Sequence, residues 1–132
     1  MEIDAGNGVR VSGRIDLIRH RDTDEVVVID FKSNDRTQAE EVTDLQLHVY
    51  ALGYKQGAGR GASAVAVTNL DDLSEDRQLA VTEESLEEAR AAVQRVADLL
   101  RLNDLPKDPR GESAEEKGCG RCDLIVLCRE AV

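Results

Sequence analysis

Two acidic residues and a lysine stand where a β-sheet could bring their side chains together. Asp30 and Lys32 are two residues apart in a predicted strand, so their side chains point to the same face. Asp16 lies on the polar face of the preceding predicted strand, and pairing of the two strands can bring it beside Asp30. Two carboxylates and a main-chain carbonyl form a hard oxygen site that suits Mg²⁺ or Mn²⁺. A lysine alongside can orient an attacking water or stabilise charge on a phosphate.

Three cysteines near the C-terminus form a second candidate metal site. Cys119, Cys122 and Cys128 have the spacing C-x2-C-x5-C. An odd number of cysteines is a poor disulfide framework, whereas thiolates this close together can hold one soft metal centre in a reducing compartment. A zinc site and three reduced thiols are the alternatives. The preceding stretch, Asn103 to Lys117, is polar and is predicted to be a linker.

The strands that carry the acidic residues are predicted from their apolar patterns. From Val9 to Ile18 apolar or small residues alternate with polar ones, which puts Asp16 on the polar face. From Glu25 to Lys32 four consecutive apolar residues indicate a strand covered on both faces. Phe31 is expected to point into the core. The polar link 20–24 favours an antiparallel pair.

Two helices and two more strands are predicted after this pair. A helix is expected from Thr37 to Lys55, with Thr37 as its cap and the glycine-rich run 56–61 as its end. Strands are expected at 62–68 and 78–81. Thr82 is then a good cap for a second long helix. The residues expected to recur at helical spacing on the apolar faces are Val42, Leu45, Val49 and Leu52 in the first helix, and Leu86, Ala89, Val93, Val96 and Leu100 in the second.

This order of elements predicts an α/β fold with a small mixed central sheet flanked by helices. The net charge of −10, from 17 basic and 27 acidic residues, argues against a broadly basic nucleic-acid binder. It leaves room for a small local groove, or for divalent metal bridging acidic residues to a phosphate. No apolar run approaches the roughly 20 residues that span a bilayer. No secretory signal is visible, so the expected compartment is the cytoplasm.

Three motifs in this chain resemble those of RecB-type nucleases in the PD-(D/E)XK superfamily. They are Gly13-Arg14-Ile15-Asp16, Asp30-Phe31-Lys32 and Gln46-Leu47-His48-Val49-Tyr50, which match G-x-x-D, D-x-K and Q-x-x-x-Y. Each motif alone is weak, since a solvated strand acid, a strand-end ion pair and a helix-surface pair are common. All three in order, at about the expected spacing and on the expected elements, are much more specific.

The resemblance implies a restriction-endonuclease-like core and a metal-dependent deoxyribonuclease. Asp16 and Asp30 would bind Mg²⁺ or Mn²⁺, with the main-chain carbonyl of Phe31 as a further ligand. Gly13 is the motif glycine, and the helix would hold its glutamine and tyrosine near the lysine or the DNA. The residues that the resemblance assigns to catalysis are Asp16, Asp30, Lys32, Gln46 and Tyr50.

The cysteine spacing resembles the C-terminal part of the iron–sulfur staple in AddB-type nucleases and CRISPR-associated relatives. This implies a 4Fe–4S cluster on Cys119, Cys122 and Cys128, completed by a fourth cysteine upstream in a longer parent protein. Only twelve residues precede Gly13, so that cysteine and the upstream helix that usually offers a histidine ligand are expected to lie outside this chain. We therefore expect a nuclease core at 1–103, truncated at its N-terminus, and a linker with the cluster-ligand tail at 104–132.

The resemblance further implies DNA as the partner, either single-stranded or at its ends, with a helicase motor in the same or a partner chain. Such a domain would be the C-terminal module of a helicase–nuclease or of a DNA-end-processing exonuclease involved in repair. Two other functions stay open at this point. The chain could be a catalytically inert DNA-binding or scaffolding module that keeps the nuclease fold, or a zinc-stabilised interaction domain built around its cysteines.

Overall fold

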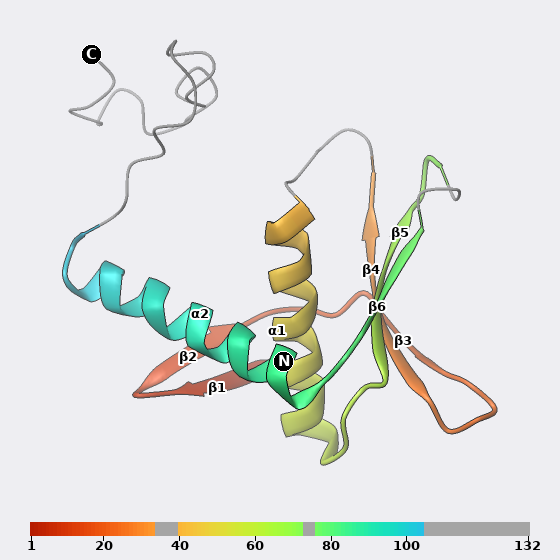
Figure 1. Ribbon diagram of the computed structural model, residues 1–132, viewed down its shortest axis with the longest axis horizontal. Helices are drawn as coiled ribbons and strands as arrows, with labels where there is room; N and C mark the ends of the chain where they lie inside the picture. Colours follow the sequence, from red (N-terminus) through yellow and green to blue (C-terminus); the bar gives the residue numbers. More distant parts are fainter. Residues whose placement is uncertain (34–39, 73–75, 105–132) are drawn as a thin grey trace, which may run out of the picture. The chain divides into compact units, whose positions relative to one another are not determined.

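The computed structural model describes residues 1–33, 40–72 and 76–104 (Figure 1). In chain order its elements are β1 (Glu2–Gly6), β2 (Val9–Ser12), β3 (Leu17–His20), β4 (Val26–Lys32), α1 (Glu40–Ala58), β5 (Ala64–Asn69), β6 (Arg77–Ala80) and α2 (Glu83–Arg101). The chain divides into two units, Met1–Asp98 and Leu99–Val132, and all the strands and α1 belong to the first. No described helix has the length and apolar character needed to cross a membrane.

Four strands form a mixed sheet in the order β3-β4-β5-β6. β4 is antiparallel to β3 and parallel to β5, and β6 is antiparallel to β5. The chain passes between the two parallel strands through α1, which contacts both of them. A crossover of this kind is required because parallel neighbours cannot be joined by a tight turn. β1 and β2 form a separate antiparallel hairpin. The expected α/β class with a small mixed sheet is confirmed.

Successive residues of β4 are buried on opposite faces of the sheet. Val26 and Val28 join a core cluster that includes Leu47 of α1, whereas Val27 and Ile29 join a second cluster with two alanines of β5. This arrangement explains the apolar run without alternation, as predicted. Phe31 departs from its prediction because it lies beyond the second cluster, near the end of β4, and is 38% exposed.

The predicted continuous strand 9–18 is wrong. The chain forms β2 and β3 there, and these pair with different strands, β1 and β4. Between them Gly13 donates a backbone hydrogen bond to Met1 O (3.1 Å) and accepts one from the Met1 amino group (2.7 Å). Burial still alternates through residues 13–16, the crossing segment that connects β2 to β3, so the pattern alone could not reveal the change of partner. β1 escapes prediction, although Asn7 and Gly8, both with positive φ, are typical of a tight hairpin turn.

α1 continues past its predicted end at residue 55 and stops at Ala58, where Gly59 has φ +70°. The proposed cap Thr37 lies outside the described residues. Val42 (51% exposed) and Leu45 (36%) are exposed, contrary to the predicted stripe. The residues of α1 that are buried are Thr43, Leu47, Val49, Ala51, Leu52 and Gly53. The face toward the sheet is therefore set by small and apolar residues around Leu47 and Ala51.

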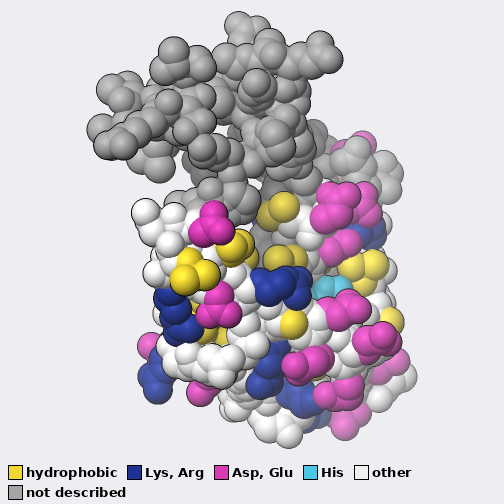
Figure 2. Space-filling model, turned by 60° about the vertical axis from the view of Figure 1, so that its left-hand side comes forward, with side chains coloured by type: hydrophobic (Ala, Val, Ile, Leu, Met, Phe, Trp, Pro, Cys, Tyr) yellow, Lys and Arg dark blue, Asp and Glu magenta, His cyan; other side chains and the backbone are white. Residues whose placement is uncertain are grey.

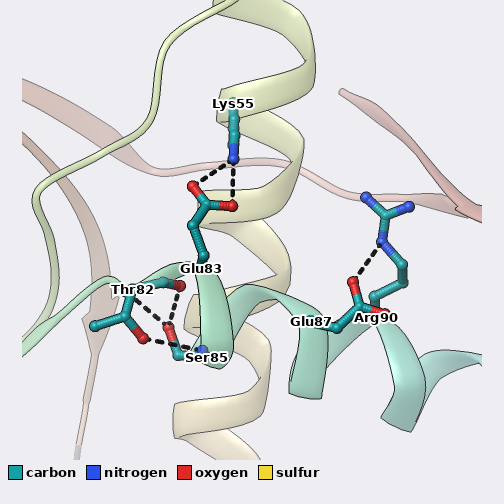
Figure 3. A network of polar contacts seen from close by, with 6 residues as sticks. All are labelled: Lys55, Thr82, Glu83, Ser85, Glu87 and Arg90. Carbon is teal, nitrogen blue, oxygen red and sulfur yellow. Dashed lines mark hydrogen bonds and ion pairs between the residues drawn. The ribbon is translucent and has the colours of Figure 1, made fainter.

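Thr82 caps α2, as the sequence predicts. Its Oγ1 accepts a hydrogen bond from Ser85 N (3.0 Å), and its own N–H donates to Ser85 Oγ (3.0 Å), which is a reciprocal capping arrangement (Figure 3). Beside this cap, Lys55 Nζ lies 2.6 Å from Glu83 Oε1 (Figure 3). The pair joins the last turn of α1 to the first turn of α2.

The predicted apolar stripe of α2 is buried only in its first half. Leu86 and Ala89 belong to the core cluster, and Val93 packs against it. Val96 and Leu100 are 53% and 58% exposed. Helical spacing identifies which residues share a face, but it does not say how far along the helix that face is covered.

Candidate active site

The centre of the candidate site is an ion pair at the end of β4. Lys32 Nζ lies 2.8 Å from Asp30 Oδ2, and the side chains are 26% and 6% exposed. Within the described residues, Asp30 Oδ2 receives no well-aligned hydrogen bond, so its contact with Lys32 is an ion pair alone. A buried carboxylate oxygen in this condition is costly unless a cation compensates it. It is therefore a suitable ligand atom for a metal ion.

The lysine is connected to two residues of α1 and, through them, to the crossing segment. Lys32 Nζ donates to Gln46 Oε1 (3.1 Å), and Gln46 Nε2 donates to Tyr50 OH (2.8 Å). Because Gln46 and Tyr50 are one helical turn apart, they lie on the same face of α1. A Cβ atom on Gly13 would lie 3.2 Å from Cε1 of the Tyr50 ring, which explains why the smallest residue occupies this position.

Asp16 approaches the end of β4 from the neighbouring chain segment that leads into β3. It lies just before β3, not within a strand as predicted, and its Oδ2 accepts a hydrogen bond from Phe31 N (3.0 Å). The last β3–β4 pair is Leu17 with Ile29, and one further step in this register would put Asp16 opposite Asp30. The structure thus brings the Asp16 carboxylate to the peptide bond that joins Asp30 and Phe31.

These residues fit a divalent cation with open coordination positions. Within residues 1–33, 40–72 and 76–104, no group of three or more His, Cys, Asp or Glu side chains is placed to hold a metal ion. The oxygen atoms considered for a cation here are the carboxylates of Asp30, beside Lys32, and Asp16, beside Phe31 N, together with main-chain oxygen. Mg²⁺ is commonly bound by one or two carboxylates together with water and substrate phosphates, not by a complete protein cage. The donor set suits a hard cation of this kind.

The end of β5 contributes a residue that the motifs do not include. Asn69 pairs in register with Lys32, and it is only 8% exposed. Its Oδ1 accepts hydrogen bonds from Asp71 N (2.9 Å) and Asp72 N (3.4 Å), while Leu70 N donates to Lys32 O (2.9 Å). The chain after β5 is thereby fixed to the lysine strand. An asparagine directly after an apolar strand is a sequence signal for such a turn.

An ion-paired arginine holds the first turns of α1 against β6. Arg77 donates hydrogen bonds to both carboxylate oxygens of Asp44 and lies 2.9 Å from Glu40 Oε1. The hydrogen bonds with Asp44 raise the pKa of Arg77 above its ordinary value, and burial opposes this shift only in part. Because Gln46 follows Asp44 by two residues, this pair also restrains the part of α1 that contacts Lys32.

A groove of about 530 Å³ lies elsewhere, between α1 and α2. Leu45, His48 and Arg95 are among its lining residues, and none of the five residues assigned to catalysis lines it. The candidate chemistry is therefore outside this groove, at the end of β4. Cys119, Cys122 and Cys128 lie outside the described residues, so the cysteine site stays a prediction.

Comparison with known proteins adds one finding. The sequence model of the PD-(D/E)XK nuclease superfamily matches residues 1–129, which is nearly the whole chain. No curated protein matches the chain.

Proposed function

Because the chain belongs to the PD-(D/E)XK nuclease superfamily, we propose that it is a metal-dependent deoxyribonuclease that hydrolyses phosphodiester bonds. Membership indicates a nuclease-like function and a nucleic-acid substrate. The choice of DNA, and the assignment of Asp16, Asp30, Lys32, Gln46 and Tyr50 to catalysis, are our proposals. They are supported by one observation above all. Contacts run from Asp30 through Lys32 and Gln46 to Tyr50, and the Asp16 carboxylate accepts a hydrogen bond from the backbone next to Asp30, so all three motifs meet at the end of β4.

In this proposal each residue has a definite task. Asp16 and Asp30 hold one or two divalent ions, with the Phe31 carbonyl as a further ligand. The ion, when bound, supplies an acidified water and offsets the charge of the phosphate. The Lys32 ammonium group orients the attacking water or stabilises charge on the phosphate as it develops. Gln46 holds Lys32 in place, and its bond to Tyr50 fixes the orientation of the Gln46 amide.

The proposal is tested by incubating the purified chain with single-stranded and double-stranded DNA in the presence of Mn²⁺ or Mg²⁺. We expect cleavage that depends on the ion and stops when EDTA is added, because in this proposal the attacking water is acidified by the ion that Asp16 and Asp30 hold. Cleavage that persists in EDTA would contradict a metal-dependent mechanism. A chain that binds DNA and metal but never cleaves would favour the inert DNA-binding or scaffolding module.

Finer assignments rest on the motif resemblance alone. We propose that Cys119, Cys122 and Cys128 bind a 4Fe–4S cluster in a longer, cytoplasmic parent protein, where a helicase motor delivers DNA ends to the nuclease. Iron and acid-labile sulfide in anaerobically purified parent protein would support the cluster. Zinc in their place, bound at a ratio of about one per chain through thiolate ligands, would favour the zinc-stabilised alternative.

A further inference from the structure

Most cations in the described part of the chain are paired with acids. Arginines and lysines with such partners occur on the strands and on both helices, and the candidate catalytic lysine is among them. Three arginines have neither an ion pair nor a side-chain hydrogen bond to any described residue: Arg14, Arg19 and Arg95. On a protein with net charge −10, these are the arginines of the described residues that are available to neutralise a polyanion.

On the face that Figure 2 displays, the described side chains offer little other attraction for DNA. Figure 2 shows acidic and basic side chains interspersed over the described part of the face that it displays, with no continuous basic surface there. The net negative charge of the protein repels a DNA strand. Binding therefore needs a specific cation close to the reacting phosphate. The location of each unpaired arginine therefore decides whether it can serve the candidate site.

Only one of the three arginines lies on the side of the Asp16 carboxylate. In the crossing segment Gly13 and Ile15 are partly buried, whereas Arg14 and Asp16 are exposed. Because exposure alternates along these four residues, Arg14 and Asp16 share the exposed side of the segment. Gly13 is held by Met1 and Ile15 packs on the core, so the backbone that carries Arg14 is fixed.

The other two arginines are placed differently. Arg19 pairs across the sheet with Val27, whose side chain belongs to the cluster on the face opposite to Asp30 and Lys32. Arg95 lines the groove between α1 and α2, which contains none of the five residues assigned to catalysis. Both have the same charge and the same lack of described partners as Arg14. They are therefore matched controls for a general electrostatic effect.

We propose that Arg14 is a substrate-positioning residue that contacts a backbone phosphate of the DNA strand beside the Asp16 carboxylate. The inference rests on the proposed nuclease function and adds to it one specific strand contact. A phosphate contact positions the strand without reading its sequence, so its contribution should be equal for DNA of different sequences. It should also appear in the salt dependence of binding, because each contact releases a counterion.

The test is steady-state cleavage of short DNA by the full chain in Mn²⁺ over a range of KCl concentrations. Arg14→Ala should raise KM roughly tenfold and change kcat less than about twofold. It should also make the negative slope of log kcat/KM against log salt concentration shallower by about one. Arg14→Lys should restore most of the affinity, because it keeps the charge. Arg19→Ala and Arg95→Ala should stay within about twofold of the wild-type KM.

The outcomes separate the two proposals. If the wild-type chain cleaves DNA but Arg14→Ala has the same KM and salt slope as Arg19→Ala, the Arg14 contact is wrong and the nuclease function stands. A fall in kcat without a change in KM would equally contradict a positioning role. If the wild-type chain does not cleave DNA in Mn²⁺, the proposed function is overturned, and the Arg14 contact with it.

Discussion

Replacement of Asp30 by asparagine is expected to lower the kcat of DNA cleavage roughly a thousandfold. The change keeps the size of the side chain but removes the negative charge that we propose to hold the cation. Asp30 is only 4% exposed, and Lys32 would keep its hydrogen bond to Gln46 Oε1. We therefore expect the free energy of unfolding to change by less than about 2 kcal/mol. Single-turnover cleavage and thermal unfolding of the same preparations measure the two effects.

Asp22→Asn is the matched control for this substitution. Asp22 is exposed in the turn between β3 and β4, and we expect its replacement to leave both cleavage and stability unchanged. Wild-type kcat in the Asp30→Asn variant would exclude Asp30 from catalysis. A large loss of stability would mean that inactivity reflects unfolding, and the kinetic result could then not be assigned to the carboxylate.

Replacement of Lys32 by methionine is expected to have two effects, because it also removes the partner of a buried carboxylate. Cleavage should fall at least about a hundredfold through loss of the ammonium group. In the absence of metal, stability should fall by about 3 kcal/mol, since the Asp30 charge is left uncompensated. Added Mn²⁺ should restore much of this stability, because an ion at the site replaces the missing positive charge. Denaturant unfolding with and without Mn²⁺ measures the stability change.

Lys55→Met is the control that shows whether the stability loss in Lys32→Met is larger than that caused by removing an ordinary lysine ion pair. Lys55 pairs with Glu83, whose side chain is 84% exposed, so removal of this pair should cost less than about 1 kcal/mol with or without Mn²⁺. Equal stability losses in the two variants, or a loss in Lys32→Met that Mn²⁺ does not reduce, would contradict a cation site beside Asp30.

Local sequence patterns predict much of the fold because they reflect local physical causes. The four apolar residues of β4, the cap at Thr82 and the strands after α1 were all identifiable, since burial and capping act over a few neighbouring residues. The exposure of Val42, Leu45 and Val96 was not identifiable in this way. It depends on which face of each helix meets another element, and residue spacing within the helix does not contain that information.

The candidate site could be predicted as a set of residues but not as a geometry. The motif order places Asp30, Lys32, Gln46 and Tyr50 on the elements where they are found. The crossing segment that carries Asp16 was predicted as a strand, because burial alternates there although the partner strand changes at Gly13. Neither the hydrogen bond from Leu70 N to Lys32 O nor the unpaired state of Arg14 is visible in a motif. Both depend on contacts between segments far apart in the sequence.

The central claim is that Asp16 and Asp30 bind the same divalent cation. The most direct measurement is calorimetric titration of Mn²⁺ into the wild-type chain, Asp16→Asn and Asp30→Asn, with Asp22→Asn as control. Asparagine at position 16 keeps an oxygen that can accept the hydrogen bond from Phe31 N. We predict that both site variants bind Mn²⁺ at least about tenfold more weakly than the wild type and the control. Wild-type affinity in Asp16→Asn would show that Asp16 only supports the backbone, and would contradict the account.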